Sequence, residues 1–332
     1  MPALQPGPNA AFYVVMNAGS GHSETELRES TIRTVLEEAG RTCHLERVDD
    51  PAELGEIARR MAAKAKENDG VVVAAGGDGT INTVAHEAVQ QGCLFGVLPQ
   101  GTFNYFGRTH GIPEDLTEAV RALLDAPVTP VQIGMVNDRI FLVNASVGLY
   151  PQLLEAREHD KRQYGRSRVV AILSALKTAL GRHRPLRITL DTQGITRKLR
   201  TATLFVGNNR LQMEQVGMEP LTEALEDGEL AAIAPRPVGK LGMLGLLLRG
   251  AMGRLGDAEN VVAFSFKRLT VKHARLSPRR RVKVATDGEV TYMAMPLEFR
   301  VVEGRLKLLK PAPVTEVVSD SSTSIAPGSD QF

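Results

Sequence analysis

Short apolar runs alternate with longer amphipathic stretches along residues 12–124. Apolar runs of four to seven residues, bounded by polar turns, are typical of strands in the interior of a sheet. Strands that alternate with helices predict a parallel sheet covered by helices on both faces, an α/β fold in which ligands bind at the carboxyl ends of the strands. The predicted strands are Phe12–Met16, Thr42–Val48, Gly70–Ala75 and Leu94–Leu98.

The stretches between these strands carry signals for the start of a helix. Ser23 and Glu26 form a capping-box pattern that predicts a helix toward Ala39. Asp50 before Pro51 predicts an N-cap followed by the first helical position. The predicted helices are 23–39, 51–66, one that begins at Ile81, and Glu114–Leu124.

From about Val128 the pattern changes to short runs rich in Val, Ile, Thr and Phe, separated by turn residues. Such runs predict a mostly antiparallel β domain. We expect two helices within it, and a last strand at Arg305–Leu309. The predicted domains are a nucleotide-binding α/β domain at 1–127 and a β-rich lipid-substrate domain at 128–310, whose last strand can return to the first domain. The two predicted helices are Arg166–Leu180 and Lys240–Met252.

Size and composition place the chain among ordinary globular proteins. Its 332 residues, 43% of them hydrophobic, can bury the cores of two domains. A net charge of +2 and an aromatic content of 5%, without a recognition motif, argue against nucleic acid as a partner. The N-terminus lacks a secretory signal and no apolar run is long enough to span a bilayer, so we expect a cytoplasmic protein. The polar tail at 311–332 is expected to be disordered.

A glycine-rich turn directly after the third predicted strand is the first candidate for chemistry. Glycines let backbone amides approach a phosphate closely, and the start of the following helix favours an anion. An aspartate at this position can hold the magnesium ion that bridges phosphate oxygens. The alternative is a tight structural turn with a capping aspartate. The residues are Gly76, Gly77, Asp78, Gly79 and Thr80.

Two more polar loops follow strands of the predicted sheet. One is Asn17–Gly21 after the first strand, and the other is Pro99–Arg108 after the fourth. Because the carboxyl ends of parallel strands meet at one edge, the three loops are expected to converge there. No P-loop, dinucleotide fingerprint or protein-kinase motif occurs, so a nucleotide site of another type is required. The candidate nucleotide-binding residues in these two loops are Asn17, Gly19, Ser20, Gly101, Thr102 and Asn104.

Taken together, the three loops and Asn82 resemble the diacylglycerol kinase catalytic family, which also includes sphingosine kinases and bacterial lipid kinases. The resemblance implies an N-terminal α/β domain similar to the nucleotide domain of phosphofructokinases and NAD kinases, a C-terminal β-sandwich, and ATP in the cleft between them. It covers most of the chain, because it continues through Asn144–Tyr150, Phe205–Asn209, Leu225–Leu230 and Thr286–Glu289.

The resemblance also implies catalytic and metal-binding roles. Asp287 would accept the proton of the lipid hydroxyl and Glu289 would support it, although a lone Asp-Gly would be an ordinary hairpin turn. Asp78 would bind Mg²⁺ with the phosphates of ATP. Asp227 resembles a structural magnesium ligand, with Glu223 or Glu226 as helpers, or else a plain polar turn. The expected product is phosphatidic acid or its equivalent from another lipid alcohol, which places the enzyme in phospholipid metabolism.

Two positions depart from the pattern of the family. Tyr105 stands where the family often has Asp, and Thr83 stands where it often has Glu. The first departure weakens the case for a second metal-binding carboxylate. Two alternatives therefore stay open: an NAD kinase-like enzyme with the same glycine turn, and a non-catalytic nucleotide or lipid sensor of the same fold. The acceptor lipid, the preferred phosphate donor and the oligomeric state do not follow from the sequence.

Basic and apolar segments in the second half favour peripheral contact with a membrane. Lys267–Lys283 holds eight basic residues and no acidic one, and Arg182–Arg200 holds six with one aspartate. Such segments suit an anionic membrane surface, although they can equally be solvated faces. A third segment forms an apolar stripe at helical spacing, for which core packing is the default and lipid contact the alternative. The stripe is Leu241, Leu244, Leu247, Leu248 and Met252.

Overall fold

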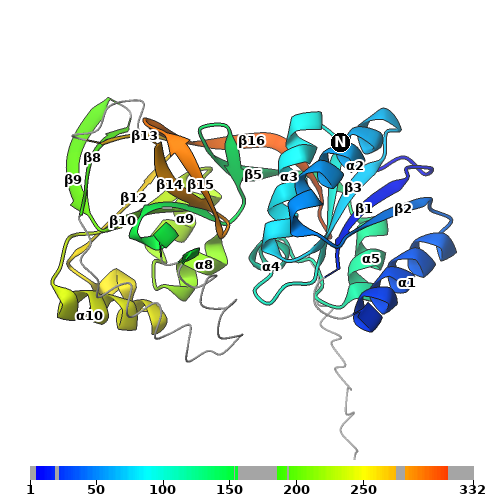
Figure 1. The fold of residues 1–332 in the computed structure, drawn as a ribbon, viewed down its shortest axis with the longest axis horizontal. Helices are drawn as coiled ribbons and strands as arrows, with labels where there is room; N and C mark the ends of the chain where they lie inside the picture. Colours follow the sequence, from blue (N-terminus) through cyan, green and yellow to red (C-terminus); the bar gives the residue numbers. More distant parts are fainter. Residues whose placement is uncertain are drawn as a thin grey trace, which may run out of the picture.

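The computed structural model describes residues 5–18, 22–152, 154–155, 185–192, 194–273 and 281–312. Figure 1 shows two parts side by side, an α/β part at the N-terminus and a β-rich part that follows it. Three sequence predictions lie outside the described residues: the loop positions Gly19 and Ser20, the helix at Arg166–Leu180, and the disordered tail from residue 313 onward.

The α/β part is built on a parallel sheet of four strands, as the sequence predicts. The strands are β1 (Phe12–Asn17), β2 (Cys43–Val48), β3 (Val71–Gly76) and β4 (Leu94–Pro99). Their order in the sheet is β2-β1-β3-β4, and β3 is buried at every position because it has a strand on either side and helices above and below.

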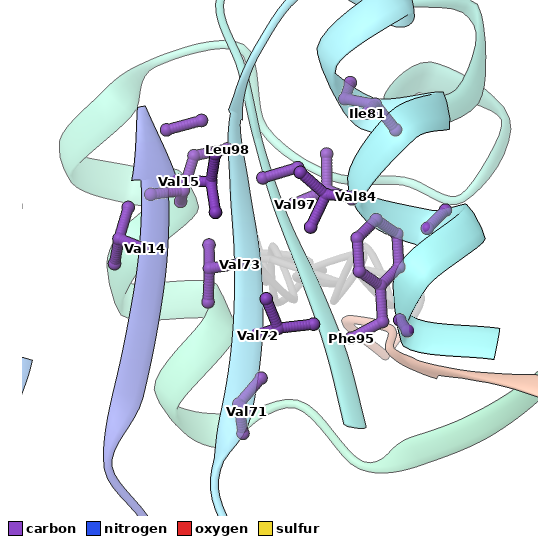
Figure 2. Packing of buried hydrophobic residues seen from close by; sticks show 14 of the residues in the cluster. Val14, Val15, Val71, Val72, Val73, Ile81, Val84, Phe95, Val97 and Leu98 are labelled. Carbon is purple, nitrogen blue, oxygen red and sulfur yellow. The ribbon is translucent and has the colours of Figure 1, made fainter. Parts of the chain in front are cut away.

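Helices cover both faces of this sheet (Figure 1). The helices are α1 (His22–Glu38), α2 (Leu54–Glu67) after a short 3₁₀ turn η1 (Pro51–Glu53), α3 (Asp78–Gln91), α4 (Tyr105–Thr109) and α5 (Leu116–Asp125). α2 packs against α3 on one face, and α1 packs against α5 on the other. Figure 2 shows valines of β1, β3 and β4 in the same buried cluster as Ile81 and Val84 of α3. This tightly packed core fixes the strand ends that carry the candidate site.

The β-rich part is a sandwich whose two antiparallel layers share one apolar core. One layer has the order β12-β11-β10-β7-β14-β15, and the other is formed by β5, β6, β8, β9, β13 and β16. The strands are β5 (Val128–Val136), β6 (Arg139–Phe141), β7 (Asn144–Gly148), β8 (Leu186–Thr192), β9 (Ile195–Thr201), β10 (Thr203–Gly207), β11 (Leu230–Pro235), β12 (Val261–Phe266), β13 (Arg268–His273), β14 (Arg281–Thr286), β15 (Glu289–Ala294) and β16 (Leu297–Leu309).

The long strand β16 connects the two parts. Its first residues, Leu297–Arg300, pair antiparallel with β13, whereas Lys307 and Leu308 pair in parallel with β4. β5 pairs antiparallel along most of the same strand, with a register shift between Val302 and Leu306. A single sheet of ten strands therefore runs from the α/β part into the sandwich. We retain the division at residues 127 and 128 as a proposal, since this strand belongs to both parts.

Helices of the β-rich part include α8 (Arg210–Gln215), α9 (Pro220–Glu226) and α10 (Lys240–Ala251), which is followed by the 3₁₀ turn η2 (Leu255–Asp257). Residues 149–152 and 154–155 are helical as well. The sequence predicted α10, but it missed α8 and α9. Those two helices have six and seven residues. Segments of two turns or fewer do not repeat the apolar spacing often enough to be recognised.

Several predicted element boundaries need correction. α3 begins at Asp78 and not at Ile81, so that Asp78, Gly79 and Thr80 form its first turn. α1 begins at His22, which places Ser23 inside the helix and not at its N-cap. The cap at Asp50 is confirmed, because its side chain accepts a hydrogen bond from the N–H of Ala52 at 2.9 Å. These shifts arise because helix ends are decided by local hydrogen bonds that the apolar pattern does not report.

Candidate active site

The two glycine-containing loops after β3 and β4 meet at the carboxyl edge of the parallel sheet, and Asn17 at the end of β1 lies beside them. Gln100, after β4, donates its backbone N–H to the carbonyl oxygen of Gly76, after β3, at 2.8 Å. A Cβ atom added to Gly101 would lie 2.9 Å from the Cα atom of Gly77. Real side chains do not tolerate that distance to backbone. The two loops therefore need glycine at position 101 in order to lie against each other.

Three of the predicted nucleotide-binding side chains hold this loop cluster together. Asn17, at the end of β1, donates its Nδ2 to Thr80 Oγ1 at 3.1 Å. Asn104 Oδ1 accepts the backbone N–H of Gly101 at 2.8 Å, and Asn104 itself has a positive φ of 47°. Thr102, in contrast, is exposed at the loop tip. The loops are thus held in position by Asn17, Thr80 and Asn104. Contact of these three side chains with a ligand stays a prediction.

Asp78 lies in the first turn of α3, directly beside the loop cluster. Its Oδ1 atom is buried and has no hydrogen-bond partner among the described residues. Burial raises the pKa of this carboxyl group, and the backbone N–H groups of Phe106, Tyr105 and Asn104 oppose that rise. A buried acceptor without a donor is costly unless a ligand satisfies it. A hard cation such as Mg²⁺ prefers such oxygen atoms, so Asp78 fits the predicted metal.

The predicted catalytic turn forms the tip of the hairpin between β14 and β15. Asp287 and Gly288 are its two central residues, with φ angles of 47° and 92°. Two residues with positive φ define the type I′ turn that suits the twist of paired strands, which is why Asp-Gly occurs here. The turn projects Asp287 and Glu289 toward the start of α3.

The carboxylate of Asp287 accepts four hydrogen bonds. Its Oδ2 accepts from Asn82 Nδ2 at 2.6 Å and from the N–H of Leu142 at 2.7 Å. Its Oδ1 accepts from the N–H groups of Val143 at 2.9 Å and Asn144 at 2.8 Å. Burial raises the pKa of Asp287 to about 6, although all four donors favour the ionised form and oppose that rise. Every lone-pair direction of this carboxylate is therefore in use.

The bond from Asn82 to Asp287 joins the two parts of the protein. Asn82 belongs to α3 and is 4% exposed, whereas Asp287 belongs to the sandwich. These residues are 205 positions apart in the sequence. The hairpin is consequently held in a fixed position relative to the first turn of α3, where the glycine loops converge.

Glu289, the first residue of β15, has a more open environment. Its Oε2 atom pairs with Arg139 Nη2 at 3.2 Å, and its side chain is 43% exposed. A Cβ atom added to Gly79 would lie 3.9 Å from Glu289 Oε1. The carboxylate of Glu289 therefore lies beside the first turn of α3, with one oxygen atom facing the region where the glycine loops meet.

The two departures from the family pattern have structural roles. Tyr105 donates its hydroxyl to Gln215 Oε1 at 2.7 Å, and its carbonyl oxygen accepts from Asn209 Nδ2 at 3.2 Å. These contacts hold α4 against α8, across the two parts of the protein. Thr83 donates its hydroxyl to the carbonyl oxygen of Gly79 within α3 at 3.0 Å. Neither side chain supplies a carboxylate, so Asp78 is the acidic residue of the loop cluster.

The predicted metal ligand Asp227 caps the end of α9 and is exposed. Glu226, one of its proposed helpers, instead accepts from Arg210 Nη1 at 2.5 Å. The nearby carbonyl oxygen of Glu229 accepts from Gln132 Nε2 at 3.0 Å. Within the part of the chain that the structure describes, no three acidic, histidine or cysteine side chains gather into a metal site. Metal binding at Asp227 therefore stays a prediction supported by one carboxylate.

An apolar pocket of about 350 Å³ opens in the β-rich part, between β10, β11, α8 and α10. Gln212 of α8 lines this pocket and accepts a hydrogen bond from Asn144 Nδ2 at 3.0 Å. The backbone N–H of the same Asn144 donates to Asp287. Two hydrogen bonds thus link the pocket to the predicted catalytic turn. The apolar side chains that line it include Leu149, Tyr150, Phe205, Met213, Val216, Ile233, Met243 and Leu246.

No helix among the described residues is both long enough and apolar enough to cross a membrane. The mainly apolar helix α10 has 12 residues. At about 1.5 Å per residue it reaches roughly 18 Å, short of the roughly 30 Å of a bilayer core.

Comparison with known proteins supports the same fold and family. A family model described as the diacylglycerol kinase catalytic domain matches residues 11–136. The chain is 30% identical over 248 residues to a "Probable lipid kinase YegS-like" protein of Pseudomonas aeruginosa, which covers 73% of this chain and 76% of that relative. A crystal structure of a diacylglycerol kinase from Bacillus anthracis is 16% identical, with a TM-score of 0.63 over 91% of this chain and 97% of that one, and it shows the shared fold.

Other relatives match over shorter stretches. A "Probable lipid kinase YegS-like" protein of Klebsiella pneumoniae is 36% identical over 140 residues, which is 42% of this chain and 45% of the relative. A diacylglycerol kinase of Staphylococcus saprophyticus is 33% identical over 102 residues, 30% of this chain and 33% of the relative. The matched region thus spans less than half the length of these two relatives.

Fold and sequence together define a two-domain protein of the lipid-kinase class. The chain belongs to the diacylglycerol kinase catalytic domain family.

The structure adds residues to the candidate site that sequence reasoning did not place. Arg139, which pairs with Glu289, was not a candidate site residue in the sequence. Asn82 was part of the family motif without an assigned contact. The backbone of Leu142–Asn144, which binds Asp287, carries no side-chain pattern that could reveal it. The segment Phe205–Asn209 was matched as a family segment, and the structure places Phe205 in the wall of the apolar pocket.

Proposed function

We propose that this protein is an ATP-dependent lipid kinase that transfers the γ-phosphoryl group to the hydroxyl of diacylglycerol or a similar lipid alcohol. The product is phosphatidic acid or its equivalent. The observation that carries the proposal is the hairpin of Asp287 and Glu289, held by Asn82 against the first turn of α3 and linked through Gln212 to an apolar pocket. A site that joins an anion-binding turn to an apolar pocket suits a substrate with a phosphate at one end and acyl chains at the other.

The glycine loops and the start of α3 would bind the phosphates of ATP. Backbone N–H groups at a helix start stabilise negative charge. Gly77 and Gly101 let the two loops lie against each other beside that helix start. Asp78 would hold Mg²⁺, which neutralises charge on the phosphate oxygens when it is bound. Gly19 and Ser20 stay part of the proposed nucleotide site.

The geometry favours Glu289 over Asp287 as the group that accepts the proton of the lipid hydroxyl. The carboxylate of Asp287 is saturated by four donors, so that a substrate hydroxyl would have to displace one of them. Glu289 is half exposed and has one oxygen atom facing the first turn of α3. A general base must reach the hydroxyl it deprotonates. We therefore assign Glu289 as the base and Asp287 as the residue that positions the hairpin, the reverse of the roles predicted from sequence.

The apolar pocket would receive acyl chains of the lipid. Its lining is almost entirely apolar, and a buried CH₂ group contributes about 0.8 kcal/mol. A larger cavity of about 540 Å³ opens beside Asn82, but Arg59, Glu87 and Arg139 line it, which makes it less suited to a hydrocarbon chain. Because diacylglycerol resides in a bilayer, the proposed enzyme works in peripheral contact with a membrane. Its proposed compartment is the cytoplasm.

Transfer of labelled γ-phosphate from ATP, with Mg²⁺, to a panel of lipids and to NAD would test this function. Labelled phosphatidic acid would establish diacylglycerol kinase activity, and another labelled lipid would keep the mechanism while correcting the substrate. Labelled NADP would instead support the NAD kinase-like alternative. Nucleotide binding without any labelled product across the panel would support a non-catalytic sensor.

Gly101→Ala is expected to raise the KM for ATP about tenfold, equivalent to about 1.4 kcal/mol. The added Cβ would lie 2.9 Å from both the Cα of Gly77 and the Oδ1 of Asn104, and would therefore push the phosphate loops apart. Steady-state kinetics with ATP varied at saturating lipid would measure the change. Gly55→Ala is the control, because a Cβ there meets no atom within 4 Å. An unchanged KM in Gly101→Ala would argue against phosphate binding between these loops.

Activity is expected to fall as the pH drops through about 6, where Asp287 gains a proton. Protonation turns one acceptor site of the carboxylate into a donor, so at least one of the four donors must shift and the hairpin changes its position relative to α3. The free energy of unfolding is expected to change with pH in the opposite direction to activity. Because the pKa of Asp287 is raised in the folded state, its protonated form favours folding at low pH. This contribution to stability is lost as the pH rises through about 6. The pH profile of kcat/KM would show the acidic limb.

Asn82→Ala tests the assignment of this limb. It removes a donor that favours ionised Asp287, so the acidic limb should move to higher pH. A limb that does not move in Asn82→Ala would have to be assigned to a group other than Asp287.

A further inference from the structure

Helix α10 forms one wall of the apolar pocket and is apolar on its other side as well. Met243, Leu246, Leu247 and Gly250 line the pocket. Leu241, Leu248 and Met252 lie on a different face and are 85%, 54% and 63% exposed. A helix that is apolar all round is normally buried. Here one face meets the pocket and the other meets solvent.

The exposed residues form one continuous stripe. Leu241, Gly245, Leu248 and Met252 follow each other at spacings of four, three and four residues, which places them on one side of a helix. A Cβ added to Gly245, which is partly exposed, would meet no atom within 4 Å, so none of the described residues covers the middle of the stripe. Single exposed leucines are ordinary, but a contiguous apolar stripe marks a surface that binds something.

The charges around α10 indicate what this surface binds. The sequence of α10 and the residues just before it contains the basic residues Arg236, Lys240 and Arg249 and no acidic one. Arg254, after the helix, pairs with Asp257 at 3.1 Å. An apolar stripe flanked by basic residues suits a bilayer that contains anionic lipids, because the apolar face enters the headgroup boundary and the cations pair with phosphates. The helix itself offers no acidic side chain to a basic protein partner, and the nearby Asp257 is paired with Arg254.

We propose that the outer face of α10, formed by Leu241, Leu248 and Met252, docks on the surface of an anionic lipid bilayer. Because the inner face of the same helix lines the apolar pocket, docking brings that pocket to the membrane and shortens the path of an acyl chain through water. The second point rests on the proposed lipid kinase function, whereas docking itself does not. At 12 residues the helix lies in the interface and does not span it.

The chain contains no tryptophan, so a single introduced tryptophan reports on its own position. Leu248→Trp would be mixed with vesicles of phosphatidylcholine and phosphatidylglycerol that carry brominated acyl chains, without diacylglycerol or ATP. We expect its emission to fall at least twofold relative to unbrominated vesicles. Leu27→Trp is the matched control, since Leu27 is 67% exposed on α1 of the α/β part. Equal emission from Leu248→Trp in both kinds of vesicle would overturn the proposal.

The double variant Leu241→Asp/Leu248→Asp is expected to reduce the vesicle-bound fraction in flotation at least tenfold, with Leu27→Asp unchanged. It should phosphorylate a short-chain, monomerically dissolved diacylglycerol within about twofold of the wild type, because neither leucine lines the pocket. A folded double variant that floats like the wild type would refute docking through α10. Wild-type protein that floats but phosphorylates no lipid would refute the proposed function and leave docking intact.

Discussion

Replacing Glu289 with glutamine is expected to lower kcat for lipid phosphorylation by about 10³-fold, while the KM for ATP stays within about threefold. Positioned proton transfer contributes about 10² to 10⁴ in rate, and glutamine keeps the shape of the side chain while removing its basicity. Because the loss is in kcat, the variant should still bind ATP. Single-turnover measurements of phosphoryl transfer would separate the chemical step from product release.

Two comparisons make the Glu289→Gln result specific. Glu298→Gln changes an exposed glutamate on β16 of the same sandwich and should leave kcat unaltered. Arg139→Gln removes the partner of Glu289 and should have a smaller effect than Glu289→Gln itself, because the carboxylate is retained. If Glu289→Gln keeps kcat within about threefold of the wild type while Asp287→Asn loses it, Asp287 is the base, as the sequence alone predicted.

Replacing Asp287 with alanine is expected to lower the free energy of unfolding by about 4 kcal/mol and to abolish detectable activity. The substitution leaves four donors without their acceptor, namely Asn82 Nδ2 and the N–H groups of Leu142, Val143 and Asn144. Each buried donor left unsatisfied costs about 1 to 3 kcal/mol, and water that enters the gap recovers part of the total. Urea unfolding followed by circular dichroism would measure the loss.

The stability measurement distinguishes a positioning role from a purely catalytic one. Asp138→Ala is the control, since Asp138 is exposed in the neighbouring turn between β5 and β6, and we expect a change below about 0.5 kcal/mol. Asn82→Ala should fall between the two, because it removes one donor of the four. A change below about 1 kcal/mol in Asp287→Ala would show that the four hydrogen bonds do not hold the hairpin.

The sequence by itself determined the architecture of the α/β part and the sheet edge at which its candidate site lies. A buried strand such as β3 and a helix such as α5 each have a characteristic spacing of apolar residues. This spacing can be recognised in the sequence without knowing the fold. The glycine loops were also found from sequence, because parallel strands must bring their carboxyl ends to one edge. The Asp-Gly turn was visible for the same local reason, since its positive φ angles restrict residue choice.

Only the tertiary structure decided how these pieces work together. Asn82 and Asp287 are 205 residues apart, and no periodic pattern reports a hydrogen bond over such a separation. The saturation of Asp287 by backbone N–H groups, which moves the proposed base to Glu289, involves atoms that every residue possesses and that sequence does not distinguish. The two apolar faces of α10 likewise look alike in sequence. Burial depends on what packs against each face, and only the folded chain shows that one lines a pocket while the other meets solvent.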